Sequence, residues 1–445
     1  MAGQLNQFVS GHSGGMFVLG GYAGTGKTFL TTEIIKGMAR QGKQVLVTAP
    51  THKAVKVLRG FTGDNDLGIT FSTLHSALGM KEVITKDGEQ TFVRDKFIPC
   101  KLEGCYYLIV DESSMLSDDL FGYVHEFVES ARLKVIFVGD PLQIPPVGKE
   151  DAIPFSELQQ SVYGMQVGEL HKIVRQAEGN PIIALASEVR DHVFHQYSLK
   201  GRKDTVINGT GVRFYEGAVR DEITGLCNRL FTSEQFQEDP DFAKVVAWTN
   251  RTVDAYNGMI RKMIYRDQVV DGTLPRIMEG EMLIADSPIM EDGTNRIAFS
   301  TNSEMRVLEF NVKTENVNDG QFLLKYYDTC VIDIDGTRQY WVKIIHEDSL
   351  GVYKDILRML KDLALSKTRG SWQATEAWKA FYEFQENFAQ VKYNYAITAH
   401  KAQGSTYENA IVLEYDINMN ANVRERNRIK YTAFTRPRKM LHVVL

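Results

Sequence analysis

The sequence has few of the features that mark secreted, membrane or zinc-binding proteins. Its four cysteines are scattered over 445 residues and form no C-x-x-C pair, which argues against a zinc site and predicts reduced thiols in a cytosolic protein. No apolar run approaches the ~20 residues that a membrane helix needs. The N-terminus lacks a basic segment followed by an apolar core, so we expect no signal peptide. The net charge of −5 argues against a protein coated in nucleic acid, but not against a narrow basic channel.

A glycine-rich loop stands near the N-terminus. The stretch GGYAGTGKT, residues 20–28, fits G-x-x-x-x-G-K-[ST] with Gly21, Gly26, Lys27 and Thr28 in the fixed places. Residues 16–20 predict a strand and residues 27–41 predict a helix, so the loop has the context that this motif requires. Its backbone N–H groups can bind phosphates, with Lys27 at the β and γ phosphates and Thr28 on magnesium. The loop therefore predicts a site for ATP and Mg²⁺.

Two further predicted strands end in polar residues. The apolar run from residue 105 leads directly into Asp111 and Glu112. We expect Asp111 to hold the magnesium ion and Glu112 to orient and deprotonate the attacking water. Residues 134–147 repeat this design, with a strand followed by Gly139, Asp140 and Gln143; Gln143 could hydrogen-bond the γ-phosphate, although a polar turn fixed by prolines is the alternative.

The pattern of elements predicts an α/β fold with two lobes. Strands alternate with helices in the first lobe, which favours a parallel sheet with ligands at its carboxyl edge. The same pattern returns at 243–260 and 393–445, so we expect a second α/β lobe split by an insert at about 265–390. Asp-Gly pairs in the insert indicate hairpins and a small β-barrel, followed by helices over 351–388. The aromatics of these helices are expected to pack against the barrel rather than stack on bases: Trp372, Trp378, Phe381, Tyr382, Phe384 and Phe388.

A smaller insert interrupts the first lobe. Residues 79–98 form two alternating runs about a Lys-Asp-Gly-Glu turn, which predicts a hairpin. Phe92 follows the turn and could stack on an exposed base, with Phe97 as the alternative and burial of Phe92 against the first lobe as the structural interpretation.

Other polar motifs indicate contact with the triphosphate and with a polymer. Arg436, and Arg175 as a second candidate, could carry charge from the second lobe to the transferring phosphoryl group; surface salt bridges are the alternative. Hydroxyls, histidines and helix N-termini can contact phosphate and sugar without reading sequence. The candidate DNA-binding residues are Pro50, Thr51, His52, Lys53, Thr73, His75, Phe92, Asn250, Thr398, His400, Lys401 and Ser405.

Together, the motifs resemble the superfamily 1 DNA helicases, and HKAQG with DESSM resembles the RecD-type branch. The resembling stretches are GGYAGTGKT, APTHKA, TLHSALG, DESSM, GDPLQIPPV, TNRTVDAYN, TAHKAQGST and AFTRPRK. The resemblance implies two RecA-like lobes, at 1–78 with 99–170 and at 171–264 with 391–445. It also implies a pin hairpin at 79–98 and an SH3-like barrel with helices at 265–390. It implies that Gln4 reads adenine and that Gly21, Gly24 and Gly26 hold the nucleotide.

The implied function is ATP-dependent 5′ to 3′ translocation on single-stranded DNA with separation of the duplex. Single-stranded and forked DNA, with replication or recombination proteins, are the expected partners of a monomer in the cytoplasm, or in the host cytoplasm if the chain is phage-encoded. The alternatives are an ATP-gated clamp on single-stranded DNA, or a translocase that displaces proteins without separating strands. A P-loop kinase or GTPase is disfavoured because no Asn-Lys-x-Asp motif is present and because the second lobe would have no role.

Overall fold

The computed structural model describes the chain except for residues 1, 12, 51, 63–67, 85–89, 96, 175–178, 218, 271, 292–296, 318–319 and 335–337. The chain forms two compact units, one of residues 1–81, 94–253 and 397–445 and one of residues 82–93 and 254–396. In the described part of the chain, no helix is long and apolar enough to cross a membrane.

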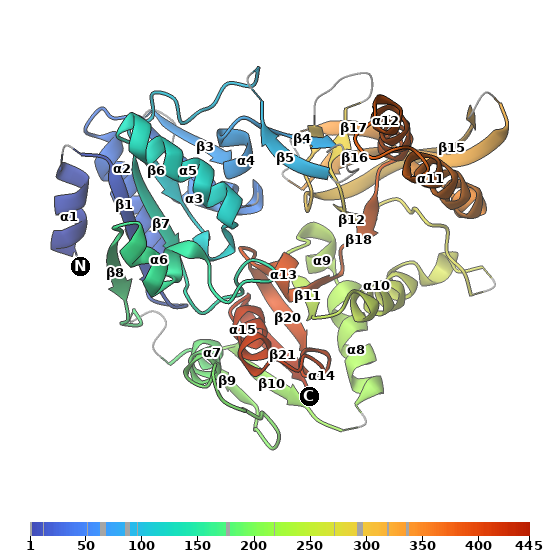
Figure 1. Cartoon of the computed structure of the whole chain (residues 1–445). Coiled ribbons are helices and arrows are strands. Elements are labelled where there is room, and N and C mark those ends of the chain that lie inside the picture. The colour runs from blue at the N-terminus through green and yellow to red at the C-terminus, as the bar shows by residue number, and fades with distance from the viewer. Residues whose placement is uncertain are drawn as a thin grey trace. The chain divides into compact units, whose positions relative to one another are not determined.

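The first lobe is built on a six-stranded parallel sheet of order β3-β2-β6-β7-β1-β8. Its strands are β1 (Gly15–Gly21), β2 (Val45–Ala49), β3 (Ile69–Thr73), β6 (Tyr107–Val110), β7 (Lys134–Gly139) and β8 (Gln166–Leu170). Its helices are α1 (Ala2–Ser10), α2 (Lys27–Ala39), α3 (His52–Thr62), α4 (Leu74–Ala77), α5 (Asp118–Ala131) and α6 (Glu157–Val162). The predicted parallel α/β sheet is confirmed (Figure 1).

Helices cover both faces of this sheet, because alternate side chains of each buried strand point to opposite faces. Apolar residues of α1, α2 and α3 pack with Phe17 and Ile109 on one face. Apolar residues of α5 pack with Val18 and Leu108 on the other. Both faces are therefore dry, and polar groups collect at the strand ends.

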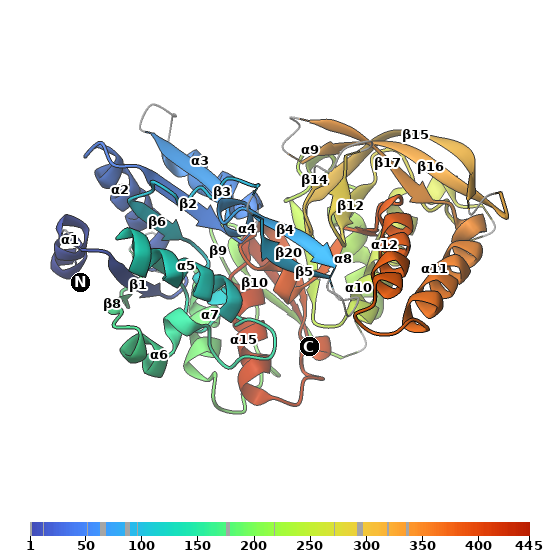
Figure 2. The ribbon, with the colours of Figure 1, turned by 45° about the horizontal axis from the view of Figure 1, so that its top comes forward.

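The second lobe has a sheet of order β19-β11-β20-β21-β10-β9, in which β9 is antiparallel to β10. Its strands are β9 (Thr205–Ile207), β10 (Thr210–Tyr215), β11 (Ala243–Ala247), β19 (Ala396–Thr398), β20 (Tyr407–Leu413) and β21 (Pro437–Val444). Its helices are α7 (Pro181–Asp191), α8 (Arg220–Phe231), α9 (Glu234–Glu238), α13 (Ala399–Ala402), α14 (Glu414–Ile417) and α15 (Val423–Phe434). Helix α7 packs on α15, and residues of both join one core cluster with β20 and β21 (Figure 2).

The second compact unit contains a five-stranded antiparallel sheet of order β17-β16-β15-β12-β18. The strands are β12 (Met282–Ala285), β15 (Glu304–Val317), β16 (Phe322–Asp333), β17 (Gln339–Ile345) and β18 (Val391–Tyr393), with a separate pair β13 (Ile289–Met290) and β14 (Ile297–Phe299). Its helices are α11 (Leu350–Leu365) and α12 (Trp372–Glu386), with α10 (Asn250–Ile264), whose first turn belongs to the first unit. Strands β4 (Met80–Ile84) and β5 (Gln90–Arg94) form a two-stranded sheet of their own.

The aromatics of the insert helices fall into three environments. Phe388 and Phe384 pack in a cluster with residues of β16 and β17, as expected. Trp378 and Tyr382 instead fill a cluster between α11 and α12. Trp372 is 73 % exposed. The expectation that the aromatics pack against the strands therefore holds for Phe384 and Phe388. It was wrong for Trp378 and Tyr382, which pack between the two helices, and for the exposed Trp372.

Candidate functional site

The strand order brings three loops to one edge of the first sheet. Strands β6, β7 and β1 are neighbours, and all three run parallel. The carboxyl ends of parallel strands meet at the same edge, where ligands of open α/β sheets bind. The glycine loop, the acidic pair and the segment after β7 therefore lie side by side.

The glycine loop has backbone conformations and close contacts that favour glycine at Gly21, Gly24 and Gly26. Gly24 and Gly26 have φ of 76° and 82°, in the left-handed region that side chains disfavour. A Cβ on Gly21 would lie 3.1 Å from Lys27 Cγ. The Lys27 ammonium donates to the Tyr22 carbonyl at 3.0 Å. The loop thus offers backbone N–H groups and one ammonium at the N-terminus of α2, which suits phosphate oxygens.

The acidic pair lies at the end of β6. Burial, and next the Glu112 charge, raise the pKa of Asp111, while Lys27 opposes this rise. Glu112 has φ of 50°, an uncommon conformation for a residue with a side chain. Two carboxylates that repel in a partly dry site fit a hard divalent cation. Thr28, exposed in the first turn of α2, adds a hydroxyl oxygen of the same ligand class.

These residues fit magnesium rather than a metal enclosed by protein ligands. Among the described residues, no group of three or more His, Cys, Asp or Glu side chains could hold a metal ion. Magnesium keeps several waters and is usually bound through one or two carboxylates and substrate phosphates. Thr28 and Asp111 are the candidate protein ligands.

Gln143 occupies a buried position beyond β7. It is 4 % exposed, and its amide oxygen has no hydrogen-bond partner among the described residues. The chain packs closely at Gly139, the last residue of β7, where a Cβ would lie 2.8 Å from the Phe155 ring. A buried amide oxygen that lacks a partner costs free energy, so the Gln143 side chain is poised for a further partner at this edge.

The turn that follows α13 in the second lobe contacts two first-lobe segments: the one after the acidic pair, at Ser114, and the one after β7, at Ile144. The Gln403 amide donates to the Ser114 hydroxyl at 3.1 Å and to the Ile144 carbonyl at 3.3 Å. A Cβ on Gly404 would lie 3.8 Å from Glu112 Cγ. The motif TAHKAQGST, predicted to bind DNA, thus lies close to the side chain of Glu112, which is predicted to activate water.

Arg436 is held by its own lobe. It is 5 % exposed. Its guanidinium donates to the Thr432 carbonyl at 2.9 Å, to the Ser405 carbonyl at 3.3 Å and to the Thr435 hydroxyl at 2.7 Å. In this structure the charge is therefore directed to the second lobe. Arg175 lies outside the described residues.

Two predicted DNA-binding threonines are helix N-caps. Thr73 accepts from the Ser76 N–H at 3.4 Å, and Thr398 accepts from the Lys401 N–H at 3.3 Å. Burial lowers the pKa of His75, and it also lowers the pKa of His400. Both imidazoles are therefore neutral near pH 7, so they can contact DNA by hydrogen bonding or stacking but add no positive charge.

The remaining predicted residues are spread over several elements. Ser405 is buried, Asn250 is exposed at the start of α10, and Phe92 is 37 % exposed on β5. Gln4 is exposed on α1. Pro50 directly follows β2 and is partly buried. Thr51 and the side chains of His52 and Lys53 lie outside the described part of the chain.

A polar stripe on α15 was missed by sequence reasoning. Arg424 and Arg428 pair with Asp151 of the first lobe at 2.8 and 2.6 Å. About one turn beyond Arg428, Tyr431 and Thr432 also contact first-lobe residues. Along α15, the polar residues 424, 428, 431 and 432 are spaced so that they recur on one side of the helix, among apolar residues that are buried. This spacing is the signal that could have revealed the polar face.

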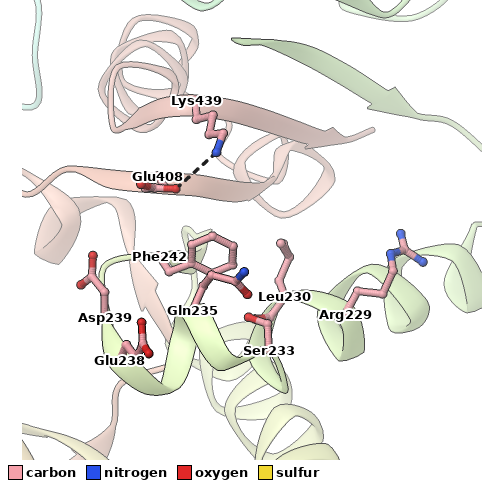
Figure 3. A pocket seen from close by; sticks show the side chains of 9 residues that line it. All are labelled: Arg229, Leu230, Ser233, Gln235, Glu238, Asp239, Phe242, Glu408 and Lys439. Carbon is pink, nitrogen blue, oxygen red and sulfur yellow. Dashed lines mark hydrogen bonds and ion pairs between the residues drawn. The ribbon is translucent and has the colours of Figure 1, made fainter. Parts of the chain in front are cut away.

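One pocket of about 440 Å³ lies away from these loops, over α8, α9 and the starts of β20 and β21 (Figure 3). Its lining residues are Arg229, Leu230, Ser233, Gln235, Glu238, Asp239, Phe242, Glu408 and Lys439. Lys439 and Glu408 approach each other to 3.7 Å. It contains none of the residues predicted to bind nucleotide or DNA.

Comparison with known families agrees with this geometry. Residues 3–206 match the AAA domain family, and residues 393–444 match the UvrD-like helicase C-terminal domain. The ATP-dependent DNA helicase Dda of Enterobacteria phage T4 is 29 % identical over 94 % of this chain and 92 % of its own length. The matches support an ATP-dependent DNA helicase that resembles those of superfamily 1. The resemblance inferred from the motifs is thereby confirmed.

Other relatives of this helicase cover the chain equally well. An uncharacterized protein of Acanthamoeba polyphaga mimivirus is 25 % identical over 99 % of this chain and 97 % of its own length. The crystal structure of the Pif1 helicase from Candida albicans has a TM-score of 0.50 and 18 % identity, and the match covers 100 % of this chain and 93 % of that one. The latter match shows a shared fold.

Proposed function

We propose that this chain hydrolyses ATP to move 5′ to 3′ along single-stranded DNA and to separate the duplex ahead of it. The observation that carries the proposal is that the TAHKAQGST motif lies against the segment that follows the acidic pair, with Gln403 bonded to Ser114 and Gly404 close to the Glu112 side chain. If this motif binds DNA, as we propose, its movement would reach the residue proposed to activate water. The 5′ to 3′ direction of translocation rests on the family resemblance alone.

On the nucleotide side, the Lys27 ammonium and the backbone N–H groups of the loop at Gly21, Gly24 and Gly26 would bind the phosphates. Thr28 and Asp111 would hold magnesium, which supplies positive charge to the phosphate oxygens when bound. Glu112 would take the proton of the attacking water. Gln143 would donate an amide N–H to a γ-phosphate oxygen, while its buried amide oxygen, which has no donor among the described residues, would be free to accept a further hydrogen bond.

Arginines of the second lobe would complete the site. A guanidinium that reaches the transferring phosphoryl group stabilises the transition state. Arg436 would have to exchange the three bonds that hold it in its own lobe. Arg175 is the other candidate, and Gln4 is proposed to read adenine.

On the DNA side, we propose that the N-termini of two helices contact the phosphate backbone of a single strand. Thr73 and Thr398 cap the N-termini of α4 and α13, which follow β3 and β19, and the positive end of a helix attracts phosphate. The proposed contacts are Pro50, Thr51, His52, Lys53, Thr73, His75, Asn250, Thr398, His400, Lys401 and Ser405. Neutral histidines and hydroxyls suit binding that does not read sequence.

The inserts are proposed to serve strand separation. We assign residues 79–98 as the pin, with Phe92 as the residue that meets the terminal base pair, and residues 265–390 as an SH3-like barrel with its helices. The lobes are assigned to 1–78 with 99–170 and to 171–264 with 391–445. A half-exposed aromatic on β5 can stack on a base.

ATP turnover with and without single-stranded DNA tests the proposal. Strong stimulation supports a motor, whereas DNA binding gated by ATP without stimulated turnover supports a clamp. Strand displacement by Phe92→Ala separates the pin from the motor. If the variant keeps stimulated turnover but loses strand separation, Phe92 acts as the wedge; if it unwinds at the unmodified rate, that role is wrong.

A further inference from the structure

One hydroxyl of the second lobe joins two nucleotide loops of the first. Tyr431 of α15 is 1 % exposed. Its hydroxyl donates to Asp140 Oδ2 at 2.6 Å and accepts from the Ala23 N–H at 2.9 Å. Ala23 belongs to the glycine loop, and Asp140 directly follows β7. Among the described residues, no other hydrogen bond links the glycine loop to α15.

Asp140 in turn shapes the segment that carries Gln143. Its second carboxylate oxygen accepts from the Leu142 N–H at 3.0 Å. Its carbonyl accepts from the Gln143 N–H at 3.2 Å. Because Asp140 is fully buried, its orientation depends on these bonds and on Tyr431. The Tyr431 hydroxyl therefore acts on the γ-phosphate segment as well as on the glycine loop.

Neighbouring contacts bring the second lobe to the same two loops. The Arg190 guanidinium of α7 lies 4.4 Å from the centre of the Tyr22 ring, one residue before Ala23. Thr432 accepts from the Ile144 N–H at 3.2 Å, one residue after Gln143. Burial, and next the Asp140 charge, raise the pKa of Tyr431 well above its usual range, so the hydroxyl keeps the proton that it donates.

We propose that Tyr431 is a positioning residue that couples the two activities: it holds the glycine loop and the Asp140–Gln143 turn in the arrangement that DNA-bound lobes require for hydrolysis. The proposal rests on the proposed function. When the lobes move about the nucleotide, the two bonds of Tyr431 are made or broken together, so both loops sense the same movement. A single hydroxyl then transmits DNA binding to the phosphate site.

The test compares Tyr431→Phe with Tyr395→Phe. Phenylalanine keeps the Tyr431 ring in its apolar cluster and removes only the hydroxyl. Tyr395 is a matched control, since its buried hydroxyl donates to Glu281 at 2.8 Å and accepts from the Met282 N–H at 3.4 Å. We expect Tyr431→Phe to lower the ratio of DNA-stimulated to DNA-free kcat at least about tenfold, and Tyr395→Phe to change it less than about twofold.

A second measurement uses the unmodified chain. Hydrogen exchange of the peptide that contains Ala23 should slow when single-stranded DNA is added to the chain with a non-hydrolysable ATP analogue. Equal exchange with and without DNA would overturn the proposal, as would an unchanged stimulation ratio in folded Tyr431→Phe or an equal loss in both variants. If the unmodified chain shows no DNA stimulation, the proposed function fails as well; if stimulation is present and Tyr431→Phe retains it, only the role of Tyr431 fails.

Discussion

Gln403 offers the sharpest test of how the lobes communicate. Its side chain is 2 % exposed and makes two hydrogen bonds to the first lobe, to the Ser114 hydroxyl and the Ile144 carbonyl. Each such bond contributes about 0.5–1.5 kcal/mol net, so Gln403→Ala removes about 1–3 kcal/mol from the state that makes both. If nucleotide and DNA binding are coupled through this contact, that energy corresponds to about a 5- to 150-fold change in the coupling factor.

The assay measures the affinity for a single-stranded oligonucleotide with and without a non-hydrolysable ATP analogue. The ratio of the two affinities should move toward one in Gln403→Ala, and by reciprocity the effect of DNA on analogue binding should change by the same factor. Gln390→Ala is the matched control, because the Gln390 amide also makes two hydrogen bonds, to the Tyr353 hydroxyl and the Phe388 carbonyl. A folded Gln403→Ala variant with the ratio of the unmodified chain would refute the reasoning.

Four other substitutions have defined outcomes. Glu112→Gln should bind ATP but turn over very slowly, and Lys27→Ala should abolish turnover without unfolding; normal steady-state turnover in either would remove the site from the mechanism. Arg436→Ala should lower kcat by about 10³ or more if its charge reaches the phosphoryl group, whereas weakened DNA binding at normal kcat would assign it to holding Ser405. Burial, and then the charges of Arg213 and Arg229, lower the pKa of His442 to about 4 in the folded chain. Between about pH 6.5 and pH 4 the unfolded chain therefore binds a proton that the folded chain does not, so the folded state loses stability as the pH falls through this range. Denaturant titrations should show that the unmodified chain loses about 2 kcal/mol more unfolding free energy than His442→Gln between about pH 7.5 and pH 5; parallel losses would contradict the shift.

Local patterns in the sequence were sufficient for the first lobe. A strand, a glycine loop and a helix follow one another within residues 15–39, and the buried strands at β6 and β7 read as continuous apolar runs because both faces of a parallel sheet are covered. The polar residues at their ends could therefore be placed at one edge before the structure was known.

Contacts between distant segments could not be predicted in this way. Tyr431 and Ala23 are 408 residues apart in the chain, and nothing in the neighbourhood of either residue indicates the bond. Arg436 illustrates the same limit, since its charge predicted a phosphate contact while the fold supplies three acceptors in its own lobe. Strand β18 pairs with β12, over 100 residues earlier, because pairing in this sheet depends on non-local packing.

Strand displacement on tailed duplexes tests the central claim most directly. The unmodified chain is mixed with ATP, magnesium and duplexes that carry a single-stranded tail at either the 5′ or the 3′ end. A parallel reaction replaces the unmodified chain by Glu112→Gln, as the control without hydrolysis. The account predicts that the unmodified chain separates the duplex with the 5′ tail, that it leaves the duplex with only a 3′ tail paired, and that the variant separates neither. Equal separation of both duplexes, preference for the 3′ tail, or separation by Glu112→Gln would contradict it.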